Sequence, residues 1–133
     1  RYPHSMLVPY VLPGQDATVA YGARDLSFEN NSGDPLVIWS DTRGNTLTIA
    51  IYGVKSPPKV TLHHELLGWQ KRHTVYRNNS NLPPGEEKII VEGADSVTVK
   101  SWLTIEDPDG TVATKDLGID HYNPMPKVIE KAL

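Results

Sequence analysis

The sequence predicts an all-β protein built from short antiparallel strands and hairpins. In most segments apolar and polar residues alternate with a period of two, as they do on a strand with one buried face. Eleven Pro and ten Gly also divide the 133 residues into short segments. Because Pro removes a backbone donor and Gly adopts turn conformations that other residues avoid, this punctuation favours strands and turns over long helices.

Strand-like segments occur throughout the chain and end at turn-forming residues. Gly44 can supply the positive φ of a tight hairpin turn at residues 41–45, and Gly68 and Trp69 are expected in another turn. The expected strands are residues 25–29, 36–40, 46–52, 59–67, 71–77, 88–92, 97–105 and 111–117. Alternate residues of the strand 97–105 should face the core, namely Val97, Val99, Leu103 and Ile105.

An internal boundary is expected at residues 53–58, which combine a Gly, a Ser and two adjacent Pro. This composition stiffens the chain and removes two donors from any strand ladder. We therefore predict two parts, residues 1–55 and residues 56–133.

Charge and composition exclude several classes of function. The net charge is −3, with 13 Lys and Arg scattered among 16 Asp and Glu, so the chain lacks the basic excess of a nucleic-acid-binding protein. The absence of Cys excludes disulfides, thiolate metal sites and a cysteine nucleophile within these residues. No apolar run approaches the roughly 20 residues that span a bilayer. We expect no cofactor.

The N-terminal third carries four linked motifs, which are His4-Ser5, a Tyr-Val-X-Pro-Gly run at residues 10–14, Asp-Ala-Thr-Val at 16–19 and Asp-Leu-X-Phe-X-Asn at 25–30. Together they resemble the VanW family of bacterial envelope proteins, named for an accessory gene of vancomycin-resistance clusters. The resemblance covers residues 1–53 and implies a β-sandwich or barrel-like part and an extracytoplasmic, cell-envelope location. The sequence begins at Arg1 in the middle of this motif, so we expect the chain to be a fragment or a mature piece of a longer protein.

The second half resembles the extracellular five-glycine (G-five) domain, a small β module. The shared pattern comprises residues 82–93, the hairpin 97–117 and a Tyr-X-Pro-X-Pro-X-Val run at 122–128. Gly85, Gly93 and Gly110 stand where the pattern has glycine, whereas its closing Val-Gly pair is missing.

His4 and Asp16 allow two interpretations. Short polar residues in loops commonly accept backbone hydrogen bonds and close turns, so both can serve loop geometry alone. The resemblance also implies a Cys upstream of this point in the family, for which His4 would be the base and Asp16 the residue that orients it. Under either interpretation this chain alone should be catalytically inactive.

Two further motifs carry no predicted site. His63 and His64 are neighbours on a strand and point to opposite faces, and Glu65 shares a face with His63 only, so we predict no metal site there. Residues 107–110 lack the further oxygen donors of a calcium loop and are expected to form a turn.

Aromatic residues supply the candidates for binding. Trp102 is out of phase with Val99 and Leu103, so it should lie on the opposite strand face, where it either packs against the first half or meets a ligand. An aromatic ring beside polar groups suits a sugar, and the proposed contact residues are Trp69, Trp102, Tyr76 and Arg77.

The sequence therefore predicts a non-catalytic cell-envelope module that either binds cell-wall glycan or peptidoglycan or acts as a spacer there. Two alternatives stay open. One is part of an enzyme site containing His4 and Asp16, and the other is a purely structural spacer, which requires Trp69 and Trp102 to be buried between the two parts.

Overall fold

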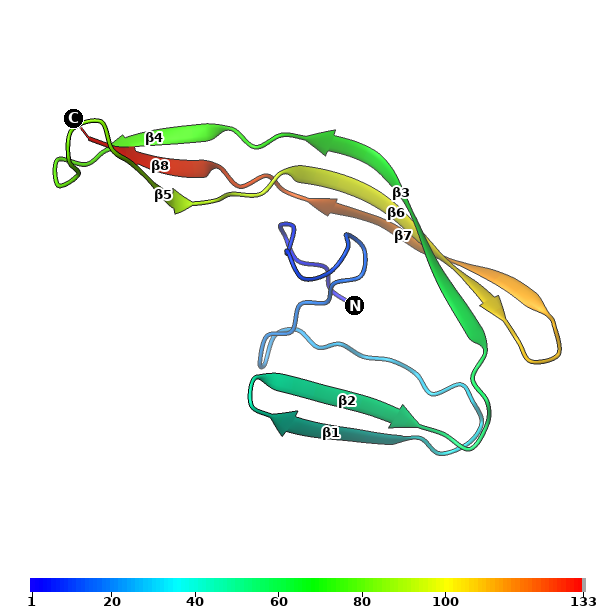
Figure 1. Cartoon of the computed structure of the whole chain (residues 1–133). Helices are drawn as coiled ribbons and strands as arrows, with labels where there is room; N and C mark the ends of the chain where they lie inside the picture. The colour runs from blue at the N-terminus through cyan, green and yellow to red at the C-terminus, as the bar shows by residue number, and fades with distance from the viewer. Residues whose placement is uncertain (133) are drawn as a thin grey trace.

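The computed structural model describes residues 1–132 and confirms the all-β class, with eight strands and no helix in that range (Figure 1). The strands are β1 (Val37–Arg43), β2 (Thr46–Tyr52), β3 (Lys59–Gln70), β4 (Thr74–Asn78), β5 (Glu87–Val91), β6 (Ser96–Glu106), β7 (Val112–Tyr122) and β8 (Lys127–Lys131). Leu133, the last residue of the predicted second part, lies outside the described residues.

The strands form three small sheets. β1 and β2 make an antiparallel hairpin, β3, β6 and β7 make an antiparallel sheet with β6 in the middle, and β8 lies between β4 and β5. β4 runs parallel to β8. Figure 1 shows the two three-stranded sheets end to end as one long curved ribbon, with the N-terminal segment between this ribbon and the β1–β2 hairpin.

Several strand predictions hold and others need correction. β1, β2, β5, β6 and β7 form close to the expected positions, and the β1–β2 turn contains Gly44 at φ 58°. Residues 25–29 form no strand, because no other segment pairs with them. Gly68 and Trp69 do not form a turn; both lie within β3, which continues past a bulge between Leu66 and Gly68. Within residues 1–55 the only sheet is the β1–β2 hairpin, so the sandwich or barrel expected there is absent from the described residues.

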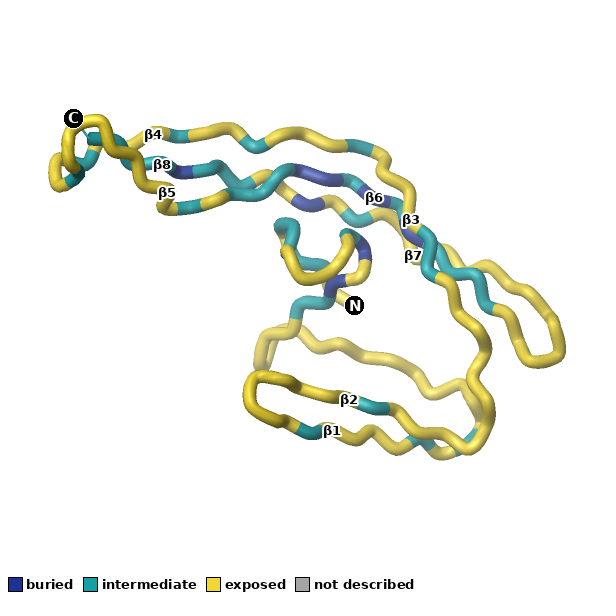
Figure 2. Tube along the Cα trace, in the orientation of Figure 1, coloured by how far each residue is buried: buried dark blue, intermediate teal, exposed yellow. Residues whose placement is uncertain are grey.

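The small core lies where the N-terminal segment covers β6 and β7. Val97, Val99 and Tyr122 are buried together, and Leu7 packs against them. Figure 2 shows buried stretches on β6 and in the N-terminal segment that lies beside it. Leu103 and Ile105, predicted to face inward, share the strand face of Val97 and Val99 but are only half-buried. The segment before β1 thus contributes to the packing of strands that follow the predicted boundary at residue 55, and the division into two parts stays a prediction.

Candidate functional site

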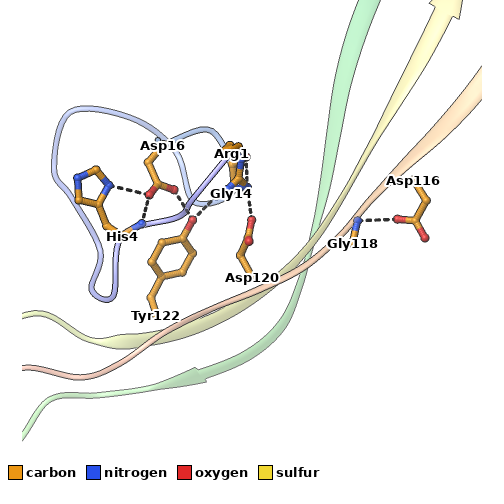
Figure 3. A network of polar contacts seen from close by, with 8 residues as sticks. All are labelled: Arg1, His4, Gly14, Asp16, Asp116, Gly118, Asp120 and Tyr122. Carbon is orange, nitrogen blue, oxygen red and sulfur yellow. Dashed lines mark hydrogen bonds and ion pairs between the residues drawn. The ribbon is translucent and has the colours of Figure 1, made fainter. Parts of the chain in front are cut away.

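The most extensive polar network in the core is centred on the carboxylate of Asp16 (Figure 3). The backbone N–H of His4 donates to Asp16 Oδ2 at 2.6 Å, and His4 Nδ1 lies 2.8 Å from the same oxygen. The hydroxyl of Tyr122 donates to the other oxygen, Oδ1. Asp16 is only 3% exposed. Both oxygens of this buried carboxylate have hydrogen-bond partners, and these come from two distant parts of the chain.

Local structure brings the N-terminal segment back on itself so that His4 meets Asp16. The backbone N–H of Thr18 donates to the carbonyl of Tyr2 at 2.6 Å, and Gln15 N–H donates to Leu12 O at 3.1 Å to close a turn. Gly14 takes φ +87° in this turn, a conformation that favours glycine. Its N–H donates to the hydroxyl of Tyr122 at 2.7 Å.

Further hydrogen bonds and an ion pair connect this loop to the C-terminal end of β7. The backbone N–H of Asn123 donates to Ser5 O at 2.7 Å, directly after Tyr122 at the end of β7. Arg1 pairs with Asp120 of β7, and its guanidinium also donates to Gly14 O at 3.0 Å. The site is therefore assembled from a loop and a strand that lie more than 100 positions apart in sequence.

The network shifts two ionisation equilibria. Burial acts to raise the pKa of Asp16, but hydrogen bonds from the His4 backbone, the Tyr122 hydroxyl and the His4 ring outweigh it and leave that pKa below its ordinary value. Burial, followed by the hydrogen bond to Asp16, raises the pKa of Tyr122 to about 12. At neutral pH the network therefore holds an ionised carboxylate and a neutral phenol.

The geometry defines which nitrogen of His4 carries the proton. An ionised carboxylate only accepts hydrogen bonds, so the Nδ1 atom facing Asp16 must be the protonated one. In the neutral ring Nε2 then keeps its lone pair; it lies 3.4 Å from the Tyr10 hydroxyl, and the His4 side chain is 27% exposed. This arrangement has the form of a base and its orienting carboxylate.

A second candidate site lies on the opposite face of the β3–β6–β7 sheet. The ring of Trp102 stacks on that of His63, with centroids 5.4 Å apart and planes at 12°. Next to it is a shallow pocket of about 240 Å³. Its lining comprises Glu65, Lys100, Trp102, Thr114 and Asp116.

The structure does not gather the four predicted contact residues into one site. Residues directly opposite on paired strands share a face, so Trp69, which pairs with Val97, faces the other side from Trp102. Trp69 is 59% exposed, and its ring N–H donates to Asp95 at 3.2 Å. Tyr76 and Arg77 lie on β4 in a different sheet, and the Lys131 ammonium is 4.0 Å from the centroid of the Tyr76 ring.

Sequence reasoning identified His4, Asp16 and Trp102 but missed Tyr122 and the polar residues around Trp102. Tyr122 lies in the Tyr-X-Pro-X-Pro run, yet nothing in that run connects it to Asp16. The polar lining around Trp102 could have been found from strand pairing, because Lys100 shares its strand face and Glu65 lies opposite Lys100. Across residues 1–132, no three His, Asp or Glu side chains cluster as metal ligands, and no helix is long and apolar enough to cross a membrane.

Comparison with known proteins finds similarities to the N-terminal part of the chain. Residues 1–52 match the family model described as VanW like protein. The Uncharacterized protein YoaR of Bacillus subtilis (strain 168) is 42% identical over 52 residues, which are 39% of this chain and 17% of that protein. The match thus spans about a sixth of that relative's length, and it confirms the VanW resemblance predicted from the N-terminal motifs.

Two solved G5 domains also resemble the chain. The IgA1 protease G5 domain has 17% sequence identity and a TM-score of 0.36, covering 61% of this chain and 98% of that domain. HP0197-G5 has 20% identity and a TM-score of 0.31, covering 55% of this chain and 97% of that domain.

Proposed function

We propose that this chain is a non-catalytic module of a bacterial cell-envelope protein and that it binds cell-wall glycan. The VanW-like match of residues 1–52 supports the envelope assignment. The pocket beside Trp102 supports binding, because it joins an aromatic ring to carboxylate, ammonium and hydroxyl groups on one open sheet face.

The chemistry of this pocket fits a sugar ring. The C–H face of a pyranose packs on an indole, whereas its hydroxyls need hydrogen-bond partners at the rim. Glu65 and Asp116 offer acceptors, and Lys100 offers a donor. The stack with His63 holds the Trp102 ring in place, which lowers the conformational entropy lost on binding.

The test is a titration with soluble muropeptides followed by tryptophan fluorescence. In the variant Trp39→Phe/Trp69→Phe, Trp102 is the only remaining tryptophan, and we expect a saturable change in its emission. The matched control, Trp39→Phe/Trp102→Phe, retains Trp69 and should give no change. A flat response from the first variant would reject glycan binding at this face.

A second candidate function is supported by the contact between His4 and Asp16. In this alternative the pair belongs to an acyl-transfer site whose cysteine nucleophile comes from outside these residues. The thiol proton passes to His4 Nε2, and Asp16 stabilises the resulting imidazolium through Nδ1–H. The thiolate then attacks the carbonyl carbon of a murein peptide or ester. As the C–N or C–O bond breaks, the His4 imidazolium returns its proton to the departing amine or alcohol, and water releases the acyl group from the sulfur.

Activity measurements separate the two functions. Residues 1–133 alone should not turn over murein peptides or esters, and turnover by this chain would refute both the non-catalytic proposal and the need for an external nucleophile. In the full-length gene product, His4→Ala should abolish turnover if the second function holds. Turnover that is unchanged in His4→Ala would exclude His4 as the base.

A further inference from the structure

We propose that Tyr122 is a positioning residue for the His4 imidazole and acts on it through Asp16. The inference rests on the second candidate function, in which His4 is the base, and extends that site to a residue of the second half of the chain. Tyr122 does not contact a substrate in this proposal. It fixes the carboxylate that in turn fixes the imidazole.

The hydrogen bonds of the Tyr122 hydroxyl define its direction. Gly14 N–H donates to this oxygen at 2.7 Å, so the hydroxyl hydrogen is left to point at Asp16 Oδ1. With Oδ1 occupied, Oδ2 is the oxygen that faces His4, where it receives both the backbone N–H and Nδ1. Each oxygen of the carboxylate therefore has its own partners.

Burial makes this arrangement rigid. Tyr122 is 1% exposed and packs in the core with Val97, its neighbour across the β6–β7 pair. It comes from the end of an 11-residue strand, whereas His4 comes from a loop. A functional side chain on a loop gains precision when a rigid element supports the residue that orients it.

The consequence for His4 is a fixed tautomer. As long as Asp16 Oδ2 accepts from Nδ1–H, the lone pair of the neutral ring is on Nε2. The His4 side chain as a whole is 27% exposed. Without the Tyr122 hydroxyl, Asp16 Oδ1 loses its side-chain donor inside the core, and Gly14 N–H loses its acceptor. The carboxylate is then expected to rotate toward the Gly14 N–H, because an unpaired buried polar group is costly. The His4 ring then loses its defined partner and exchanges between tautomers.

The experiment is ¹⁵N NMR of the histidine ring nitrogens over a pH series, compared on the alkaline plateau where the spectra no longer change with pH. The ¹⁵N shifts there report directly which nitrogen carries the proton of the neutral ring. We expect His4 in the unaltered chain to show a protonated Nδ1 and an unprotonated Nε2. In Tyr122→Phe both resonances should move toward the average of two tautomers. Asp16→Ala removes the acceptor of His4 Nδ1–H and is the positive control for a lost tautomer. Tyr76→Phe, on a distant strand, is the matched control that should leave His4 unchanged.

One measurement needs no variant. In the unaltered chain the Tyr122 hydroxyl proton should exchange slowly with solvent and show a nuclear Overhauser effect to the Gly14 amide proton. A rapidly exchanging hydroxyl, or an unchanged His4 tautomer in a folded Tyr122→Phe variant, would overturn the positioning role. Neither result affects the enzyme proposal itself, because that proposal is tested by the turnover of the His4→Ala variant.

Discussion

Ser101 shows how closely the loop and the strand approach each other at the scale of single residues. Its side chain is 1% exposed, and its hydroxyl has no hydrogen-bond partner among the described residues. A Cβ added at Gly14 would overlap Ser101 Oγ, so the Ser101 hydroxyl lies directly against the backbone of Gly14. The buried hydroxyl thus carries a desolvation cost that no hydrogen bond offsets.

Ser101→Ala should therefore stabilise the protein. Removing an unpaired buried hydroxyl is expected to raise the free energy of unfolding by about 1 kcal/mol. Urea unfolding followed by far-ultraviolet circular dichroism measures the change, and Ser56→Ala, at an exposed position, is the control with no expected effect. A lower midpoint for Ser101→Ala would show that this hydroxyl does have a partner in solution.

A bulge in β7 sets the geometry of the Trp102 face at the scale of elements. The β6–β7 register shifts between Ser101 and Trp102, which places Asp116 opposite Trp102 and Gly118 opposite Ser101. Gly118 has φ +88°, and its N–H donates to Asp116 Oδ1 at 2.9 Å. The bulge therefore depends on a glycine and also holds one of the carboxylates of the pocket.

Gly118→Ala should destabilise the protein for this conformational reason alone. No atom lies within 4 Å of an added Cβ, so the expected loss of about 1–2 kcal/mol comes from the left-handed backbone. The control is Gly68→Ala in β3, where φ is not positive and the nearest atom is 3.8 Å away. Thermal unfolding of both variants compares them, and an equal loss of stability in the control would refute the backbone explanation.

Strand pairing also explains which elements could be predicted from sequence. The strands β1, β2, β6 and β7 were located because each pairs with a neighbour that a short turn connects. β5 was located as well, but its pairing with the distant β8 could not be predicted. Residues 25–29 alternate equally well, yet a strand exists only where a partner accepts its hydrogen bonds. The contact of Asp16 with Tyr122, separated by 106 positions, depends on tertiary packing that no local pattern encodes.

At the scale of the whole molecule, the core that joins the N-terminal segment to β6 and β7 is small, and the β1–β2 hairpin lies apart from it. The hairpin contacts no other described strand. Its exposed apolar side chains are Val37, Ile38, Trp39, Leu47, Ile49, Ile51 and Tyr52. Since isolated hairpins are marginally stable in water, we attribute most of the cooperative stability to the core around Asp16 and Tyr122.

This concentration of stability predicts a characteristic pH profile. The pKa of Asp16 is lowered on folding, so its contribution is present above the ordinary carboxyl pKa of 3.8 and is lost as the pH falls below it. The pKa values of Asp95 and Asp109 are also lowered, so these two residues add to the acid limb of the profile, which is the fall in stability at low pH. Asp16→Asn should therefore flatten the acid limb without abolishing it, as urea unfolding between pH 2 and 6 would measure.

Tyr122 determines the alkaline limb, where the sign is reversed. Its pKa rises from 10.0 in the unfolded chain to about 12 in the folded one, so between these values the unfolded state has lost a proton that the folded state keeps. Stability then falls by on the order of 2–3 kcal/mol across these two pH units. Tyr122→Phe cannot ionise and should show a much shallower decline, with Tyr52→Phe, on the exposed hairpin, as the matched control. Since the pKa of Lys131 is also raised, a residual slope is expected in every variant, and only equal slopes in Tyr122→Phe and Tyr52→Phe would contradict the assignment of the limb to Tyr122.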